Sequence, residues 1–252
     1  MKNLTLFEIE KYLVRNNSTL ARFAGMPYPD DDSLSSISNC LIHEELSYDV
    51  TNLQDELHSL LTSLTNEQRL VFDDIMKTVE GNEGGVFFVY SYGGTGKTFL
   101  WKTLSAAIRS KAEIVLNVAS SGIASLLLSG GRTAHSRFHI PFNLTEDSVF
   151  QIKPQSDVAN LLKETKLIIW DEASMVHKHA FEALDRTMKD IFNSGTSVNS
   201  DIPFRGKVIV FGGDFRQILP VVPNGDLVNL MEKVYENSSK LLHSQKANHD
   251  LF

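Results

Sequence analysis

A glycine-rich stretch is followed directly by a lysine and a threonine, the residue types that bind nucleoside triphosphates. The candidate phosphate-binding residues are Gly93, Gly94, Thr95, Gly96, Lys97 and Thr98. In such a turn, backbone N–H groups wrap the phosphates, and the following helix adds a positive dipole end. Lys97 is expected to neutralise the β and γ phosphates, and the Thr98 hydroxyl to bind Mg²⁺. The stretch therefore predicts ATP and Mg²⁺ as cofactors, with a chance glycine turn as the alternative.

One residue departs from the usual pattern G-x-x-x-x-G-K-[ST]: its first glycine is Ser91 in this chain. Ser91 comes before the glycines that approach the phosphates, so it does harm only if its position needs a positive φ. We therefore expect Ser91 to weaken ATP binding modestly at most.

An acidic pair follows the apolar run LIIW. Asp171 and Glu172 stand at what would be the carboxyl end of a strand, the edge where ligands bind in open α/β folds. Asp171 is expected to hold Mg²⁺ through its water shell, and Glu172 to polarise the attacking water. A helix N-cap is the alternative. In this order after Lys97 and Thr98, the pair predicts nucleotide hydrolysis.

Two glutamines could also contact the nucleotide. Gln217 follows Asp214 after the apolar run 207–211, where it could sense the γ-phosphate; a polar turn closed by Pro220 and Pro223 is the alternative. Gln68 stands in LTNEQ, and its amide can both donate to and accept from adenine. Thr65 and Gln68 also have the spacing of a helix capping box.

Small polar residues gather in the segment 118–141, which could contact a nucleic-acid strand. The candidates are Ser120, Ser121, Gly122, Thr133, His135 and Ser136, together with Arg137. Hydroxyls, backbone amides and an arginine suit phosphate contacts, but turn chemistry and helix capping explain the same residues. Phe138 could stack on a base or lie in the core, whereas Trp101 and Trp170 are expected in the core. His177 and His179 lack a third metal ligand, which indicates a solvated helix start.

The elements that must position these residues follow from hydrophobic patterning. Apolar runs at 84–90, 113–119, 166–170 and 207–211 lack polar alternation, which is typical of strands buried on both faces of a parallel sheet. Helical patterns at 99–108, 121–128 and 180–192 alternate with them, so we predict a doubly wound α/β domain. Further helical patterns at 6–13 and 41–61 precede it, on either side of a Pro-, Asp- and Ser-rich linker near 26–38.

Composition excludes several classes of protein. Cys40 is the only cysteine in 252 residues, so the chain has no internal disulfide, which fits a reducing compartment. Glu8 and Glu10 interrupt the stretch that would form a signal peptide, and no apolar run approaches membrane-spanning length, so no membrane partner is expected. The formal charge of −7 gives no overall basic surface, so nucleic-acid binding would depend on a local groove.

These segments, in this order, resemble the Pif-type DNA helicases of helicase superfamily one, especially the plant and Helitron-transposon branch. The resemblance runs from Leu6 to about Gly225. It rests on LTNEQ, GGTGKTFLWKTL, ASSGIASLLLSGGRTAHSRFHIP, IIWDEASM and VIVFGGDFRQILPVVP, and on the lead-in segments LFEIEKYL, MPYPD and LIHEELSYD. It implies a RecA-like P-loop NTPase fold with a motor domain over 63–225, preceded by a helical extension over 1–62. Residues 226–252 depart from the family pattern, and their own sequence predicts a helix followed by a polar tail.

The resemblance also implies roles for residues. Gln68 would recognise adenine, residues 94–98 would bind phosphate and Mg²⁺, Asp171 and Glu172 would handle metal and water, and Gln217 would sense the γ-phosphate. Residues 120–122 and 133–136 would contact single-stranded DNA.

The implied activity is ATP-dependent 5′ to 3′ unwinding, on single-stranded DNA or duplex junctions, in repair, recombination and telomere maintenance. The expected location is the nucleus, with the mitochondrion as the alternative, and a monomer is one option for the oligomeric state. After Asp226 the residues match no later helicase motif, so we expect the second motor domain to be lacking. The alternative function is therefore a module that binds ATP but unwinds little or no DNA, and a P-loop ATPase of another kind is a third.

Overall fold

The computed structural model describes residues 6, 9, 10, 12–14, 18–28, 39–81, 84–91, 94, 96–192, 202–214 and 249–251. Within these residues, six parallel strands form one sheet in the order β3-β2-β4-β5-β1-β6. Their bounds are β1 Gly85–Ser91, β2 Ile114–Ala119, β3 Arg132–Thr133, β4 Thr165–Asp171, β5 Val208–Gly213 and β6 His249–Leu251. The four predicted apolar runs form β1, β2, β4 and β5, which confirms the predicted α/β fold.

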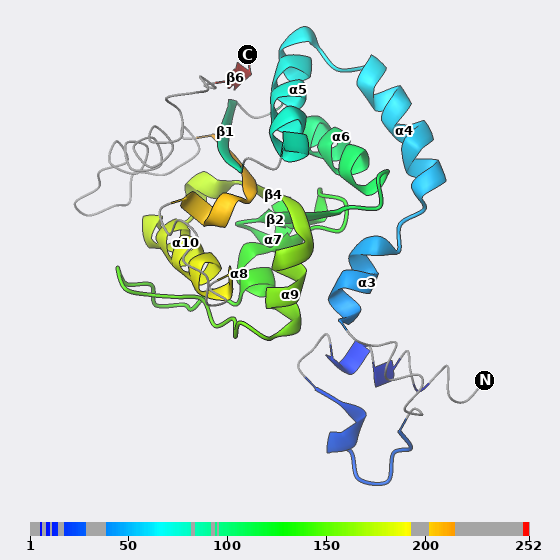
Figure 1. Cartoon of the computed structure of the whole chain (residues 1–252), viewed down its shortest axis with the longest axis vertical. Helices are drawn as coiled ribbons and strands as arrows, with labels where there is room; N and C mark the ends of the chain where they lie inside the picture. The colour runs from blue at the N-terminus through cyan, green and yellow to red at the C-terminus, as the bar shows by residue number, and fades with distance from the viewer. Residues whose placement is uncertain are drawn as a thin grey trace.

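Helices cover both faces of the sheet (Figure 1). Helices α5 (Asn66–Gly81) and α6 (Lys97–Arg109) pack on one face, and α8 (Ala134–Phe138), α9 (Asp157–Glu164) and α10 (Lys178–Phe192) pack on the other. Strand β4 explains this division: Leu167 and Ile169 join the first core, whereas Ile168 and Trp170 join the second. Successive side chains of a strand point to opposite faces, so an unbroken apolar run supplies two cores.

Shorter helices complete the connections. Helix α7 (Gly122–Leu126) follows β2, and 3₁₀ turns lie at η1 (Leu20–Arg22), η2 (Ala173–Met175) and η3 (Pro203–Gly206). Because η2 follows β4 directly, it begins at the acidic pair that the sequence singled out.

Phe138, which the sequence left between core and surface, lies in the core together with Trp101 and Trp170, which were predicted there. Trp101, Trp170 and Phe138 are all fully buried. The Phe138 ring lies 5.6 Å from the Trp170 ring and 6.2 Å from the Phe150 ring, centroid to centroid. Phe138 is therefore a core residue and not a base-stacking platform.

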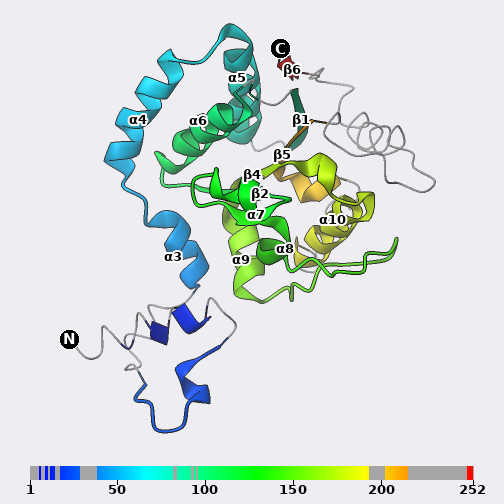
Figure 2. The ribbon, with the colours of Figure 1, turned by 180° about the vertical axis from the view of Figure 1, so that it is seen from behind.

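The helical pattern expected over 41–61 forms two helices, α3 (Cys40–Leu46) and α4 (Val50–Thr62), which run along one flank of the sheet domain (Figure 2). The break follows from Asp49, whose carboxylate accepts hydrogen bonds from the N–H groups of Thr51 and Asn52 at 3.0 and 3.1 Å. Such an N-cap starts a new helix. Part of the predicted linker, 29–38, lies outside the described residues, and the domain boundaries stay predictions. No helix in the described part of the chain is long and apolar enough to cross a membrane.

Candidate nucleotide and nucleic-acid site

The glycine turn joins the end of β1 to the start of α6. Gly94 and Gly96 have φ angles of +86° and +90°, in the left-handed region that favours glycine. A Cβ built on Gly94 meets no described atom within 4 Å, so the turn presents an open face there. Gly93 and Thr95 lie outside the described residues. The turn is thus followed by a helix N-terminus, the arrangement that binds phosphate.

Lys97 and Thr98 open helix α6 at this turn. Lys97 is 8% exposed, whereas Thr98 is exposed. The positive charge of Lys97, at the start of the helix after β1, acts on Glu172, at the end of β4. The structure therefore brings together the lysine and the acidic pair that the sequence placed 74 or more residues apart.

Asp171 ends β4 and is 5% exposed. Three buried oxygens at the carboxyl ends of β4 and β5 have no hydrogen-bond partner within the described residues: Asp171 Oδ1, Glu172 Oε2 and Ser174 Oγ. Buried polar atoms without partners cost free energy and call for water, an ion or a ligand.

These oxygens fit a magnesium ion that is shared with a nucleotide. The described residues contain no group of three or more His, Cys, Asp or Glu side chains that could hold a metal. Mg²⁺ commonly takes one or two carboxylates and completes its shell with water and substrate phosphates. Asp171, with its partnerless Oδ1, supplies such a carboxylate, so the site suits a metal that arrives with the nucleotide.

Glu172 has a strained backbone and a perturbed carboxyl group. Its φ and ψ are 51° and 36°, a left-handed conformation that a residue with a side chain adopts at a cost. Burial raises the pKa of its carboxyl group, the charges of Asp171 and Asp214 raise it further, and Lys97 opposes them. Although Glu172 occupies the N-cap position of η2, its side chain forms no capping bond with a described residue. Strain and a raised pKa are typical of a general base.

Gln68 has two contacts. Its Oε1 accepts from the Thr65 N–H at 3.2 Å, and its own N–H donates to Thr65 Oγ1 at 3.3 Å, which forms the capping box. Its amide nitrogen lies 2.6 Å from where a Cβ on Gly96 would stand, so the side chain packs directly on the glycine turn. The amide oxygen has a second lone pair, and recognition of adenine by Gln68 stays a prediction.

The third strand end is described only in part. Asp214 follows β5 and is 3% exposed, close enough for its charge to act on Glu172. Gln217, Pro220 and Pro223 lie outside the described residues, so γ-phosphate sensing by Gln217 stays a prediction.

Ser120 and Ser121 carry structural hydrogen bonds. The Ser120 N–H donates to the Asp171 carbonyl at 3.1 Å, and its hydroxyl accepts from Trp170 Nε1 at 3.0 Å. Ser121 caps α7 by accepting from the Ala124 N–H at 3.1 Å. The Ser120 backbone thus ties the predicted DNA-contacting loop to the acidic end of β4.

The second predicted DNA segment has both capping and exposed residues. Thr133 caps α8 by accepting from the Ser136 N–H at 3.2 Å. His135 and Ser136 are exposed, as is Gly122 on the first segment. Arg137 is 4% exposed and pairs with Glu45, so the expectation that it contacts phosphate is wrong. Contact between DNA and the other residues stays a prediction.

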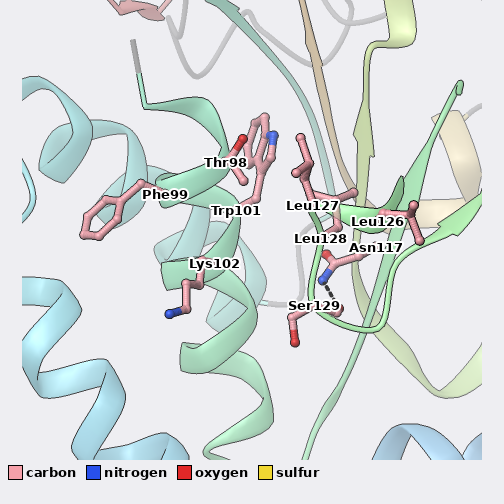
Figure 3. A pocket seen from close by; sticks show the side chains of 9 residues that line it. All are labelled: Thr98, Phe99, Trp101, Lys102, Asn117, Leu126, Leu127, Leu128 and Ser129. Atoms are coloured by element: carbon pink, nitrogen blue, oxygen red, sulfur yellow. Dashed lines mark hydrogen bonds between the residues drawn. The ribbon is translucent and has the colours of Figure 1, made fainter. Parts of the chain in front are cut away.

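A cavity of about 470 Å³ lies beside α6, and no sequence motif pointed to it. Figure 3 shows Thr98, Trp101 and Lys102 on one wall and the 126–129 segment on the other. Asn117 at its floor donates to the Ser129 carbonyl at 2.8 Å. The cavity is lined by the first turns of α6, from Thr98 to Lys102.

Comparison with known proteins places this site in context. The family model for the PIF1-like helicase matches residues 63–247. The ATP-dependent DNA helicase PIF1 of Candida albicans is 31% identical over 162 residues, which cover 63% of this chain and 16% of that protein. The ATP-dependent DNA helicase RRM3 of Saccharomyces cerevisiae is 31% identical over 195 residues, which cover 75% and 25%. The chain therefore spans a quarter or less of these relatives.

A solved structure is also similar. The crystal structure of Pif1 helicase from Bacteroides, in complex with ADP-AlF3 and single-stranded DNA, has a TM-score of 0.50 and 30% sequence identity. The match covers 68% of this chain and 36% of that one.

Proposed function

Since the chain belongs to the PIF1-like helicase family, we propose that it supplies the ATP-hydrolysing motor domain of a DNA helicase. The observation that carries the proposal is the position of Glu172. The backbone of Glu172 is strained and the pKa of its carboxyl group is raised. The residue lies at the carboxyl end of a parallel sheet, close enough to Asp171 and Lys97 for their charges to act on it. Nucleotide hydrolysis needs a cation for the phosphates, a metal-binding carboxylate and a base, and these three residues provide them.

Each residue has a distinct part in the reaction. Lys97 and the N–H groups at the start of α6 bind the β and γ phosphates, and Gln68 binds adenine. Thr98 and Asp171 would hold Mg²⁺, which when bound would stabilise negative charge on the phosphoryl oxygens. Glu172 orients the attacking water and accepts its proton, because its raised pKa makes the carboxylate more basic. Gln217 senses the γ-phosphate.

The proposed nucleic-acid partner is single-stranded DNA or a duplex junction. The Bacteroides relative was crystallised with single-stranded DNA, and this chain exposes Gly122, His135 and Ser136 on the two segments predicted to contact DNA. The Ser120 N–H bonded to the Asp171 carbonyl gives a direct mechanical link between the two sites. We further propose 5′ to 3′ movement, a role in repair, recombination and telomere maintenance, and a nuclear location, with the mitochondrion as the alternative.

The decisive experiment measures ATP hydrolysis and unwinding by this chain on forked substrates with a 5′ or a 3′ single-stranded tail. Lys97→Ala is the inactive variant, and Lys102→Ala, on an exposed face of the same helix, is the matched control. Unwinding of the 5′-tailed fork by the wild type and by Lys102→Ala, and not by Lys97→Ala, would support the proposal in full.

Other outcomes would divide the alternatives. Binding of Mg-ATP without unwinding would favour the ATP-binding module, and hydrolysis that single-stranded DNA does not stimulate would favour a P-loop ATPase of another kind. Absence of Mg-ATP binding by the wild type would overturn all three.

A further inference from the structure

Two adjacent glutamates of α3 hold two arginines of the segment 132–138. Glu44 accepts from Arg132 Nη2 at 3.0 and 3.2 Å, through both of its carboxylate oxygens. Glu45 Oε1 accepts from Arg137 Nη2 at 2.5 Å, and both side chains of this second pair are 4% exposed. The LIHEELSYD segment, which the nucleotide site does not explain, is therefore fastened to the element that carries His135 and Ser136.

The same carboxylate also reaches helix α6. Glu45 Oε2 pairs with Arg109 Nη2 at 3.3 Å, and Arg109 is 2% exposed. Arg109 also donates to the carbonyl and hydroxyl oxygens of Ser129 at 3.1 and 2.9 Å, and its guanidinium lies 3.9 Å from the centre of the Tyr48 ring. One buried carboxylate thus bridges α8 and the helix that begins with Lys97.

The side chains of the segment 132–138 point in two directions. Ala134, Arg137 and Phe138 are buried, whereas His135 and Ser136 between them are exposed. On a five-residue helix, the anchored side chains determine where the exposed ones point. A buried ion pair is sensitive to removal of one partner, because the other is left buried and uncompensated.

We propose that Glu45 is a positioning residue for single-stranded DNA: by holding Arg137 and Arg109 together, it fixes His135 and Ser136 relative to α6. The inference rests on the proposed function, in which residues 133–136 contact DNA. Helix α3 then supports the DNA-binding surface, although Glu45 itself does not contact the DNA. Affinity for single-stranded DNA then depends on Glu45, whereas affinity for nucleotide does not.

The test uses the full chain and measures two affinities in each variant, for a fluorescent oligo-dT and for a fluorescent ATP analogue with Mg²⁺. Glu45→Gln should weaken oligo-dT binding by about tenfold, since small displacements of binding groups are costly, and leave nucleotide binding unchanged. Glu56→Gln is the matched control: Glu56 of α4 also pairs with α6, through Lys102 at 2.6 Å, in a pair separate from 132–138. It should keep both affinities.

A second variant guards against loss of folding. Glu45→Gln combined with Arg137→Met leaves no buried arginine without a partner, since Arg109 keeps Ser129 and Tyr48. Removing both charges of the Glu45–Arg137 pair avoids the uncompensated buried charge that loss of one partner alone would leave. The double variant should fold, as thermal melting will show, and should bind oligo-dT about tenfold more weakly than the wild type, for the same geometric reason.

The outcomes separate this inference from the proposed function. Wild-type oligo-dT affinity in the folded double variant would overturn the inference alone. So would an equal fall in both affinities, which would give Glu45 a purely structural role. Absence of oligo-dT binding by the wild type would overturn the proposed DNA-binding function, and this inference with it.

Discussion

The amide nitrogen of Gln68 lies 2.6 Å from the point that a Cβ on Gly96 would occupy. This approach joins the first turn of α5 to the N-cap of α6, two elements on the same face of the sheet. Gly96 also has a φ of +90°, a backbone conformation that favours glycine, and a Cβ at this position would have to displace the end of the Gln68 side chain.

Gly96→Ala should therefore lower the melting temperature and abolish the stabilisation by Mg-ATP. The left-handed conformation costs a residue with a side chain roughly 1–3 kcal/mol, and the new methyl group would displace Gln68 from the turn. Thermal melting with and without Mg-ATP measures both effects.

Gly94→Ala is the control for this substitution, because Gly94 has a similar φ of +86° but no described neighbour within 4 Å of its Cβ position. The difference between the two variants isolates the contact with Gln68. Unchanged Mg-ATP affinity in Gly96→Ala would show that Gln68 does not support the nucleotide site.

Much of this site could be predicted from local sequence. The runs that form β1 and β4 are apolar enough to be buried on both faces, and parallel strands deliver their carboxyl ends to one edge. Lys97 and the acidic pair were therefore expected together, and the charge of Lys97 does act on Glu172. The capping box of Thr65 and Gln68 was likewise readable from a three-residue spacing.

Contacts between distant residues could not be predicted in this way. Arg137 looked like a phosphate ligand, because nothing in its neighbourhood reveals a carboxylate 92 positions away. The break between α3 and α4 had a local signal, the N-cap residue Asp49, which the helical periodicity over 41–61 obscured. Phe138 stood in a polar segment, although its ring faces Trp170 across the core.

Glu172→Gln should bind Mg-ATP and hydrolyse it at least about 10²-fold more slowly than the wild type, the usual contribution of a general base. Hydrolysis by the wild type should fall as the pH drops through the raised pKa of Glu172, since only the carboxylate accepts a proton. Steady-state ATPase rates across pH check both expectations. Glu146→Gln, in an exposed loop, is the control. If Glu172→Gln hydrolysed ATP at the wild-type rate, another residue would have to be the general base.

The same substitution should also change stability. The pKa of Glu172 is raised in the folded protein above its ordinary 4.5, so its negative charge opposes folding at neutral pH, and this cost disappears as the pH falls through the raised pKa. Without nucleotide, Glu172→Gln should therefore melt at a higher temperature than the wild type near pH 7. The difference in melting temperature between the variant and the wild type should shrink toward pH 4.5. A constant difference across this range would show that the negative charge of Glu172 is not its cause.

The lowered pKa of Lys207 predicts a second pH dependence of stability, at alkaline pH. Burial lowers the pKa of its ammonium group from 10.5 to about 8, helped by the charge of Lys166, while the group donates to the carbonyls of Lys163 and Thr165. The folded state thus penalises the charged form, so stability should rise as the pH increases from about 8 to 10.5. Denaturant midpoints across this range should rise for the wild type and stay flatter for Lys207→Met.

Lys166→Met is the matched perturbation for Lys207. Removing the Lys166 charge should raise the pKa of Lys207, so the rise in stability should begin at a higher pH and be smaller in total. Parallel midpoint curves for all three proteins would show that Lys207 does not titrate differently in the folded state.

Ser91→Gly tests whether the departure from the P-loop pattern matters. Ser91 is the last residue of β1 and pairs with Leu251 of β6, so its backbone belongs to a strand, where any residue is accommodated and glycine brings no advantage. The substitution should lower stability by about 0.5–1 kcal/mol, the cost of glycine in a strand. It should change Mg-ATP affinity by less than about tenfold, which corresponds to 1.4 kcal/mol.

Titration with a fluorescent ATP analogue measures the affinity, and Ser91→Ala separates loss of the hydroxyl from gain of backbone freedom. A change from no binding to strong binding in Ser91→Gly alone would mean that this position needs a glycine conformation when the phosphates bind.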